Sequence, residues 1–392
     1  MHAQALKQNP VDERLGRYRL LYRIASGGMA DLFLARSVQD PSGRLVVVKR
    51  IHDHLAGDPA FRAMLVNEAR LCARLCHPSV AQVIELCSVG DTLFIVMEHV
   101  EGESLKALVK RVRLSFAQSA RIIAAAAAGL HHAHELRDGQ GRPLDVVHRD
   151  VSPHNILVSY EGEVKVVDFG VAKARSNLEP TERGVIKGKL AYMAPEQITA
   201  GRVDRRTDVF SLGVVLYEMT TSRRLFRGAS PAETVHRILH MEIPWPSLLV
   251  DDYPRELEQI VMTALQRGPE RRFQSAGEME DALAGLVLRW NSRVTAHRAT
   301  ARSLGRVMKL VFAERIALRR ELLARSEAGT LVDGTWSTGS SPSLGPLEGT
   351  VNERPIARTR RRRLHWSLLV LAGALLALLL ALAFTWVGRA VG

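Results

Sequence analysis

One set of residues in the middle of the chain has the types and the order that phosphoryl transfer requires. Asp150 and Asn155 share the segment His148-Arg-Asp-Val-Ser-Pro-His-Asn155, and Asp168-Phe-Gly170 and Ala194-Pro-Glu196 follow it. A carboxylate can accept the proton of a substrate hydroxyl, and carboxylate and amide oxygens are ligands that Mg²⁺ prefers. The ordered set, more than any one of its members, predicts a phosphoryl-transfer site.

Two short apolar runs after Asn155 explain how these side chains can meet. Residues 156–158 and 164–167 read as two strands, and Tyr160-Glu-Gly162 reads as the turn between them. The return strand therefore brings Asp168 back beside Asn155. We assign Asn155 and Asp168 as magnesium ligands and Asp150 as the group that receives the hydroxyl proton.

A glycine turn and a lysine upstream are candidates for holding phosphate groups. Glycines let backbone N–H groups approach phosphate oxygens without a side-chain clash. Lys49 ends the apolar strand 45–48 and is placed to contact the α- and β-phosphates. Glu68, in an expected helix over 60–75, is the best candidate to pair with Lys49, and without that partner it reads as a solvated carboxylate. The candidate nucleotide contacts around the turn are Ile24, Ala25, Gly27, Gly28, Ala30 and Leu32.

The composition of the 392-residue chain excludes several classes of protein. Hydrophobic residues make up 46% and charged residues 24%, which excludes a wholly disordered chain. Three cysteines exclude a disulfide framework and indicate a reducing compartment. The formal net charge of +13 is compatible with nucleic-acid binding, so the placement of the charge decides its meaning.

The C-terminal end of the chain has the composition of a membrane span. Residues 364–387 contain no acidic or basic side chain except His365, and Trp366 and Trp386 lie near their two ends. About 20 apolar residues cross the hydrocarbon core, and aromatic rings favour its borders. We therefore predict a transmembrane helix over 364–387, with a buried core helix as the alternative. The start of the chain, residues 1–17, lacks the apolar stretch of a signal peptide.

A run of arginines directly before this stretch bears on its orientation. Next to a span, such a run indicates the cytoplasmic side and attracts anionic lipid of the inner leaflet. We therefore expect a single-pass membrane protein with its body in the cytoplasm and a short external tail, 388–392. Nucleic-acid binding through the run is the weakest alternative. Its members are Arg358, Arg360, Arg361, Arg362 and Arg363.

Two segments separate the folded body from the predicted span. Residues 293–326 are rich in Ala, Leu and Arg, with apolar positions at near-helical spacing, which predicts a helical extension. Residues 327–363 turn rich in Gly, Ser, Thr and Pro, which predicts a flexible linker that ends in the arginine run.

Residues 18–290 resemble the Ser/Thr protein-kinase superfamily, in particular the bacterial eukaryotic-like (Hanks-type) kinases, many of which place a cytoplasmic kinase domain before a membrane span. The resemblance rests on the motifs quoted above. It implies an α+β, bilobal protein-kinase-like fold, with a small antiparallel-sheet N-lobe over about 18–100 and a larger helical C-lobe over about 101–290. It further implies transfer of the γ-phosphate of ATP to Ser or Thr of protein substrates, including the kinase itself, with ATP and Mg²⁺ as cofactors.

The resemblance also assigns roles to residues that spacing alone does not identify. Met97 would be the gatekeeper, the backbone of Glu98 and Val100 would recognise adenine, and Leu157 would pack beneath the base. Two further roles are structural. They are the buried aspartate that braces the catalytic loop, at Asp208, and the ion pair of Arg272 with Glu196. The histidines His131, His132 and His134 match no set of metal ligands, and we interpret them as packing or surface residues.

Three departures from the family's pattern bear on activity. Ala25 and Ala30 replace the outer glycines of the phosphate loop, and the added methyl groups stiffen that loop. Ser152 stands where these kinases usually carry a lysine that contacts the transferred phosphate, and Lys189 stands where they usually have threonine. Our hypothesis is that Lys189 reaches in and supplies the missing positive charge, with Ser152 taking the role of the hydroxyl. The alternative is that Lys189 points to solvent.

The resemblance also bears on how the protein is regulated and on which alternative functions are open to it. Arg149 indicates regulation by an anion on the activation segment, and we favour Thr181 over Ser176 as the phosphorylated residue. A dimer would allow phosphorylation in trans. The alternative function is a catalytically impaired kinase-fold scaffold that recruits partners at the membrane. A small-molecule phosphotransferase is disfavoured, because Ala194-Pro-Glu196 and the Arg272 region fit an activation segment that binds protein substrates.

Overall fold

The computed structural model describes residues 10–169, 189–293 and 299–327, and the account below concerns these residues. They lie in the first of two compact units, Met1–Val332, whereas the second unit, Asp333–Gly392, lies outside the described residues. The predicted linker beyond residue 327, the arginine run and the predicted span at 364–387 therefore lie outside them too. In the ranges that the structure describes, no helix has both the length and the apolar character needed to cross a membrane.

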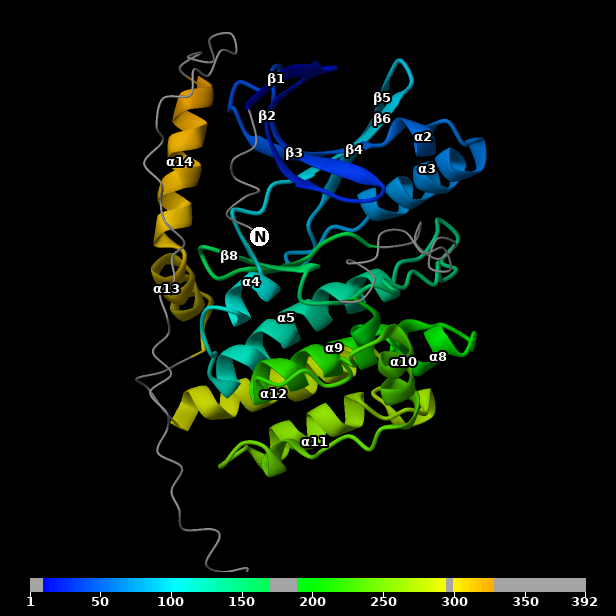
Figure 1. The fold of residues 1–392 in the computed structure, drawn as a ribbon, viewed down its shortest axis with the longest axis vertical. Coiled ribbons are helices and arrows are strands. Elements are labelled where there is room, and N and C mark those ends of the chain that lie inside the picture. Colours follow the sequence, from blue (N-terminus) through cyan, green and yellow to red (C-terminus); the bar gives the residue numbers. More distant parts are fainter. Residues whose placement is uncertain (1–9, 170–188, 294–298, 328–392) are drawn as a thin grey trace, which may run out of the picture. The chain divides into compact units, whose positions relative to one another are not determined.

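The small lobe is a six-stranded antiparallel sheet with two helices beside it (Figure 1). Its strands are β1 (Pro10–Leu15), β2 (Tyr18–Ser26), β3 (Ala30–Ser37), β4 (Leu45–Ile51), β5 (Val83–Val89) and β6 (Thr92–Glu98), in the spatial order β1-β2-β3-β4-β6-β5. The helices α2 (Asp53–Ala56) and α3 (Pro59–Ala73) follow β4. Strand β1 precedes residue 18, where the sequence placed the start of the domain. Leu15 is buried, and Gly16 (φ +59°) allows the tight turn into β2.

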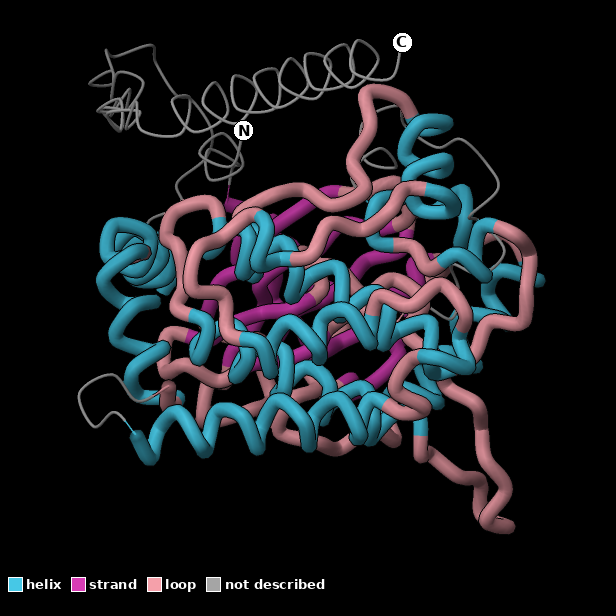
Figure 2. Tube along the Cα trace, turned by 90° about the horizontal axis from the view of Figure 1, so that it is seen from below, coloured by secondary structure: helices cyan, strands magenta, loops and turns pink. Residues whose placement is uncertain are grey.

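The larger lobe is mainly helical and has a separate small sheet on the side of the first lobe. Its strands are β7 (Gly102–Ser104), β8 (Ile156–Ser159) and β9 (Val164–Val166), in the order β7-β8-β9. Its helices are α4 (Leu105–Val109), α5 (Phe116–His134), α8 (Pro195–Ile198), α9 (Arg205–Thr221), α10 (Pro231–His240), α11 (Arg255–Ala264) and α12 (Ala276–Arg293), with 3₁₀ turns at Leu190–Tyr192, Pro246–Leu248 and Pro269–Arg271. Seen from below in Figure 2, these helices lie in front of the strands.

Local sequence explains where the two central helices of this lobe begin. Ser115 precedes α5 and accepts a hydrogen bond from the Gln118 N–H, while the Gln118 side chain accepts one from the Ser115 N–H. This reciprocal capping box satisfies two backbone donors at the helix start. Asp204 precedes α9 and accepts a hydrogen bond from the Arg206 N–H. Helix α9 is buried on nearly all sides, which fits its almost uniformly apolar centre.

Two helices, α13 (Ala301–Val311) and α14 (Ala313–Glu327), form the segment where the sequence predicts a helical extension, and α14 ends one residue beyond its predicted bound of 326. Helix α13 packs closely on the β8–β9 turn. A Cβ atom on Gly162 would lie 1.9 Å from the Ala301 carbonyl oxygen, and one on Gly305 would lie 2.8 Å from the Glu161 carbonyl oxygen. Helix α14 continues along the connection between the lobes, where Arg315 Nη1 lies 2.7 Å from Glu103 Oε2. The extension is therefore built into the kinase-like body and shares its core through Leu304, Met308 and Phe312.

Candidate active site

The loop between α5 and β8 carries Asp150 and is held by the carboxylate of Asp208. Asp208 is fully buried in α9, and its carboxylate accepts hydrogen bonds from the His148 N–H at 2.8 Å and the Arg149 N–H at 2.9 Å. His134 Nε2 lies 2.8 Å from the same carboxylate. Burial raises the pKa of Asp208, but the hydrogen bonds from His134 and His148 outweigh burial and leave the pKa below its ordinary value. Arg149 has φ +65°, a strained conformation for arginine that these bonds hold. The bracing role predicted for Asp208 is confirmed.

The carboxylate of Asp150 lies between an amide and an ammonium group. Asn155 Nδ2 donates to Asp150 Oδ2 at 3.0 Å and to the Asp150 carbonyl oxygen at 2.8 Å. Lys189 Nζ lies 2.7 Å from Asp150 Oδ2. The amide fixes the orientation of the carboxylate. The ammonium group places a positive charge beside the group that would receive a proton.

The β8–β9 hairpin brings Asp168 to the same place. Ile156 pairs with Val166 across the hairpin, and the Val167 N–H donates to the Asn155 carbonyl oxygen at 2.9 Å. Asp168 follows directly, with φ +58°, and its Oδ1 lies 2.8 Å from Lys49 Nζ. The hairpin predicted from the sequence is confirmed. It connects the two residues that we assigned as metal ligands.

The glycine turn between β2 and β3 lies next to Lys49 in the sheet. Leu32 of β3 pairs with Lys49 on one side and with Ala25 on the other. The Gly27 N–H donates to the Ala30 carbonyl oxygen at 3.0 Å and closes the turn. Ile24, at the end of β2, is 37% exposed, so its side chain is available to a ligand.

The connection between the lobes begins at the end of β6, where the sequence placed the adenine contacts. The Glu98 N–H donates to the Gln82 carbonyl oxygen at 2.8 Å, and the Glu98 carboxylate pairs with Lys165 of β9 at 3.0 Å. Glu98 therefore links the sheet of the small lobe to the hairpin of the larger one. Its side chain is occupied by this link, so only backbone atoms are left for adenine. The contacts with adenine predicted for Met97, Glu98, Val100 and Leu157 remain predictions.

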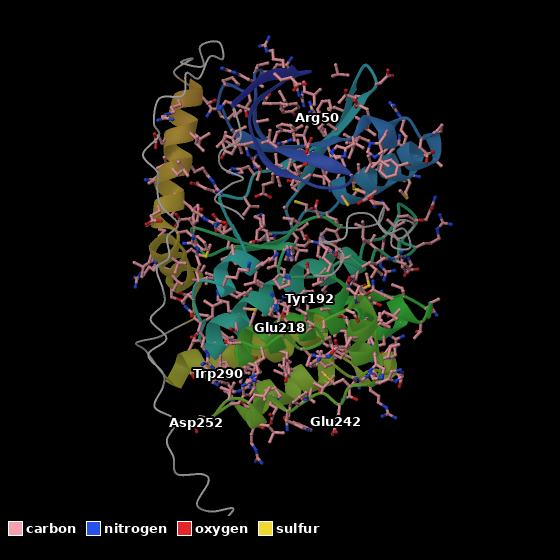
Figure 3. All side chains as sticks on the ribbon, in the orientation of Figure 1. Arg50, Tyr192, Glu218, Glu242, Asp252 and Trp290 are labelled. Atoms are coloured by element: carbon pink, nitrogen blue, oxygen red, sulfur yellow. The ribbon has the colours of Figure 1, made fainter. Side chains whose placement is uncertain are left out.

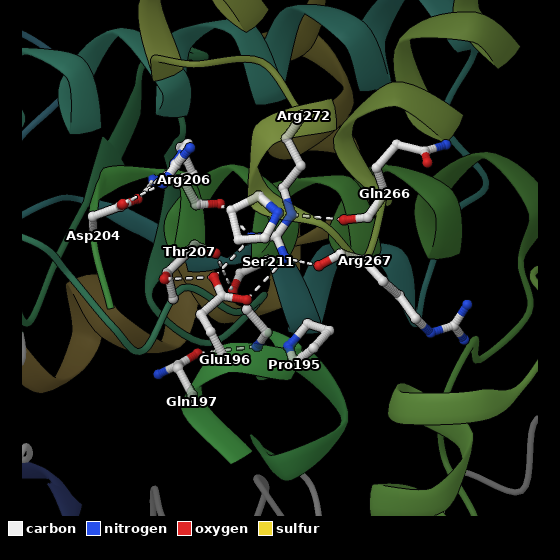
Figure 4. Close-up of polar contacts among 12 residues, drawn as sticks. Pro195, Glu196, Gln197, Asp204, Arg206, Thr207, Ser211, Gln266, Arg267 and Arg272 are labelled. Atoms are coloured by element: carbon white, nitrogen blue, oxygen red, sulfur yellow. Dashed lines mark hydrogen bonds and ion pairs between the residues drawn. The ribbon is translucent and has the colours of Figure 1, made fainter. Parts of the chain in front are cut away.

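A buried ion pair anchors the chain after residues 170–188. Arg272 Nη1 and Nη2 lie 2.7 Å and 2.8 Å from the two carboxylate oxygens of Glu196, and Thr207 Oγ1 donates to Glu196 at 2.7 Å (Figure 4). Burial raises the pKa of Glu196, but the hydrogen bonds and the charge of Arg272 outweigh burial and leave the pKa below its ordinary value. The predicted pair is confirmed. The Arg272 guanidinium also donates to the carbonyl oxygens of Arg206, Gln266 and Arg267.

Comparison with known proteins assigns this arrangement to a family. Residues 18–284, more than half of the chain, match the family model described as a protein kinase domain. The chain belongs to the protein kinase family. Among relatives of this kinase, the tyrosine-protein kinase MasK of Myxococcus xanthus is 42% identical over 70% of this chain and 43% of its own length. The serine/threonine-protein kinase PrkC of Bacillus subtilis is 32% identical over 68% of this chain and 40% of its own length.

Other comparisons extend over more of the chain or concern the fold alone. The serine/threonine-protein kinase PknL of Mycobacterium tuberculosis is 31% identical over 94% of both chains. By contrast, this kinase spans less than half the length of MasK or PrkC. The crystal structure of the Mycobacterium tuberculosis PknI kinase domain matches with a TM-score of 0.53 at 22% identity, over 70% of this chain and 98% of that one. This likeness shows the bilobal kinase fold that the sequence predicts.

The structure bears differently on Lys189 and Ser152, two positions where this kinase departs from its family. Lys189 does not point to solvent, because its ammonium group contacts Asp150 and its side chain is 27% exposed. Ser152 is 1% exposed, and its Oγ has no hydrogen-bond partner within the described parts of the chain. The predicted inward position of Lys189 is therefore confirmed, whereas the hydroxyl role given to Ser152 stays a prediction.

Other predicted contacts of this kinase remain predictions. Burial raises the pKa of the Cys72 thiol to about 12, and the charges of Glu68, Lys49 and Asp168 also act on that thiol, so these side chains share one neighbourhood. An ion pair of Lys49 with Glu68 is compatible with this placement and stays a prediction. The segment that carries Ser176 and Thr181 lies outside the described residues, as does any contact of it with Arg149.

Sequence reasoning missed two histidines of the catalytic region. His134, interpreted as a packing residue, contributes a buried ring nitrogen to the Asp208 carboxylate. His154, inside the catalytic loop, lies 2.6 Å from Lys106 Nζ of α4. Both contacts join segments far apart in the chain, and no local pattern of residues indicates them.

Replacing Gly28 by valine should weaken ATP binding without affecting the fold. A Cβ atom on Gly28 would meet no heavy atom within 4 Å, so the protein itself has room for a side chain there. Loss of about 1–2 kcal/mol of hydrogen bonding between the turn and a phosphate would raise the KM for ATP about 5- to 30-fold. Gly139→Val is the matched control, because a Cβ atom on Gly139 also meets nothing within 4 Å. Equal KM values for the two variants would contradict a phosphate-binding role for the turn.

Proposed function

We propose that this chain is a membrane-anchored protein kinase that transfers the γ-phosphate of ATP to Ser or Thr residues of proteins, including its own chain, in bacterial signalling. One observation carries the proposal. Asn155 contacts Asp150 at 3.0 Å, Lys49 contacts Asp168 at 2.8 Å, and the β8–β9 hairpin ties the two pairs together. The charges and hydrogen-bond donors needed for phosphoryl transfer thus converge from both lobes on one place.

The residues of the site have separate tasks in this reaction. The oxygen of the substrate hydroxyl bonds to the γ-phosphorus while the bond from that phosphorus to the β–γ bridging oxygen breaks. The Asp150 carboxylate accepts the hydroxyl proton, and Asn155 keeps the carboxylate oriented. Lys189 places its charge where negative charge develops, and Lys49 holds the α- and β-phosphates.

Magnesium fits the oxygen ligands that the hairpin presents. Asn155 and Asp168 offer amide and carboxylate oxygens, and Mg²⁺ is usually bound by one or two such side chains together with phosphate oxygens and water. Within the described parts of the chain, no group of three or more His, Cys, Asp or Glu side chains could hold a metal ion. When bound, the ion would neutralise phosphate charge.

The choice of Ser and Thr as targets is supported by the relatives PrkC and PknL, of which PknL matches 94% of this chain. MasK, at 42% identity, is named a tyrosine-protein kinase, so tyrosine is the second candidate target. The Lys189–Asp150 contact is compatible with either hydroxyl. The identity of the labelled residue therefore has to be measured.

The membrane anchor is supported by the sequence of residues 364–387 and by the arginine run before them. We place the kinase domain in the cytoplasm, with Arg358, Arg360 and Arg361–Arg363 at the anionic inner leaflet. The full chain should remain in the membrane pellet after an alkaline carbonate wash and leave it only in detergent. Release by the wash alone would contradict the anchor.

Radiolabelled ATP tests the kinase activity directly. The full chain, purified in detergent, should incorporate ³²P from [γ-³²P]ATP into itself and into an added protein substrate, with label on phosphoserine or phosphothreonine after acid hydrolysis. Asp150→Asn should lower incorporation by at least about 100-fold, because it removes the group that accepts the hydroxyl proton. Label on phosphotyrosine would assign the second candidate target.

The matched control is Asp145→Asn, the same chemical change at an exposed carboxylate close to the catalytic loop in sequence. Asp145→Asn should incorporate as much ³²P as the wild type. Equal labelling by the wild type and by Asp150→Asn would show that Asp150 does not accept the proton. A wild type that binds ATP but transfers no label would favour the impaired scaffold.

A further inference from the structure

A pocket of about 270 Å³ opens beside the catalytic loop, between α4 and the C-terminal end of α9. We call it the basic pocket, because five cations line it together with Pro153 of the catalytic loop. The cations are Lys106, Lys110, Arg113, Arg223 and Arg224. Among its lining residues, Glu218 is the only acidic side chain. The volume is close to the lower limit for small-ligand pockets, about 300 Å³, and suits one or two side chains.

The single carboxylate of the basic pocket does not balance these cations. Glu218, labelled with Tyr192 in Figure 3, lies 2.6 Å from Arg224 Nη1 and accepts hydrogen bonds from the Tyr192 hydroxyl at 2.7 Å and the Leu225 N–H at 3.1 Å. Burial raises the pKa of Glu218 above its ordinary value. The remaining cations, Lys106, Lys110, Arg113 and Arg223, form no ion pair with any carboxylate in the described ranges.

Lys106 connects the basic pocket to the catalytic base. Its ammonium group lies 2.6 Å from His154 Nε2, and the Nδ1 atom of His154 is buried without a hydrogen-bond partner in the described part of the chain. The charge of Asp150 also acts on His154, so the pocket and the catalytic base share one neighbourhood.

The cations also repel one another. Burial lowers the pKa of Lys106, and the charges of Lys110, Arg224, Arg227 and Lys189 lower it further. Like charges held close together repel one another, and an anion that binds between them lowers this repulsive energy. The uncompensated charge therefore indicates an anionic ligand.

We propose that the basic pocket binds an acidic side chain, carboxylate or phosphate, of the protein segment whose hydroxyl reaches Asp150. The substrates of this kinase are then proteins that carry acidic residues, or residues already phosphorylated, next to the Ser or Thr that is modified. This inference rests on the proposed function, because it names the substrate class of the same site. A protein segment is the occupant that the structure favours, since the pocket continues from Pro153 and His154 of the catalytic loop itself.

Three synthetic peptides test the proposal with the full chain in detergent. They share one Ser or Thr acceptor and differ only in its flanking residues, which are Glu in the first, phosphoserine in the second and Lys in the third. The wild type should phosphorylate the Glu or the phosphoserine peptide with a kcat/KM at least about tenfold above that of the Lys peptide. The better of the two acidic peptides identifies the anion.

Arg223→Glu places a negative charge in the pocket and should reduce that preference about tenfold or abolish it. Arg255→Glu makes the same change of charge on an exposed position of α11 and should keep the wild-type preference. Fluorescence anisotropy of the three labelled peptides on the full chain provides a second readout that needs no turnover, with the same order of affinities expected. Equal kcat/KM and equal affinity for the acidic and basic peptides would overturn the proposal, as would a preference that Arg223→Glu leaves unchanged.

The outcomes also separate this proposal from the proposed function. A chain that incorporates label from ATP into itself but shows no acidic preference is a kinase without this specificity. A chain that incorporates no label, yet binds the acidic peptides most tightly, has the pocket but not the activity.

Discussion

Replacing Lys189 by alanine should lower kcat for phosphoryl transfer by about 100- to 1,000-fold, because a fixed charge beside the developing negative charge is removed. Lys189 Nζ lies 2.7 Å from Asp150 Oδ2, whereas the lysine that meets Asp168 is Lys49. The two lysines therefore contact different carboxylates of the site. The KM for ATP should stay close to the wild-type value, because Lys49 is untouched. Steady-state kinetics with a peptide substrate measure both constants.

The double variant Ser152→Lys with Lys189→Thr separates loss of charge from loss of structure. It returns lysine and threonine to the positions that the family usually gives them, so it should exceed the kcat of Lys189→Ala at least about tenfold. Lys189 is 27% exposed, so Lys189→Ala should not shift the midpoint of thermal unfolding appreciably. Ser152 is 1% exposed, so the thermal midpoint of the double variant is measured alongside its kcat. A wild-type kcat for Lys189→Ala would show that the contact with Asp150 has no catalytic role.

The parts of the site that the sequence could predict are those with a local pattern. Asn155 and Asp168 are joined by one hairpin, and the apolar runs on either side of its turn fix the register that brings them together. The contacts of Asp208 and of Arg272 with Glu196 join distant segments, and only the resemblance to kinases identified them. Their geometry agrees with that assignment.

The parts that could not be predicted depend on contacts between distant segments with no motif. Strand β1 buries its last residue, Leu15, in the core of the small lobe. The polar residues before Leu15 give no alternating pattern that would predict a strand. The ring of His134 meets Asp208 across two helices, and the cations of the basic pocket come from α4 and from the loops that follow α4 and α9. Ser152 was assigned a role by analogy, and no local pattern of residues indicates whether its buried hydroxyl takes that role.

Replacing Arg272 by alanine should produce the largest loss of stability, about 3–5 kcal/mol, because it leaves the Glu196 carboxylate buried without its partner. The Arg272 side chain is fully buried, and its guanidinium lies over the Phe210 ring at 4.9 Å. The same substitution would also leave the carbonyl oxygens of Arg206, Gln266 and Arg267 without this donor. For a chain of this size, the midpoint of thermal unfolding should fall by about 10 °C or more.

The neighbouring Arg271 offers a matched control, because its side chain is 76% exposed and lies 3.8 Å from a carboxylate oxygen of Glu270, which is also exposed. Arg271→Ala should unfold like the wild type. Adding Glu196→Gln to Arg272→Ala should recover part of the lost stability, because it removes the buried negative charge that has lost its partner. If Arg272→Ala and Arg271→Ala had the same midpoint of thermal unfolding, the buried pair would not stabilise this part of the fold.

The pH dependence of unfolding gives an independent check on the same pair. The pKa of Glu196 is lower in the folded chain than its ordinary value, so the pair stabilises the fold fully above the ordinary pKa of glutamate. That stabilisation is lost as the pH falls through the lower, folded pKa. The difference in stability between wild type and Arg272→Ala should therefore be constant near neutral pH and shrink on acidification. A difference that grows as the pH falls would contradict an ionised Glu196 in the folded kinase.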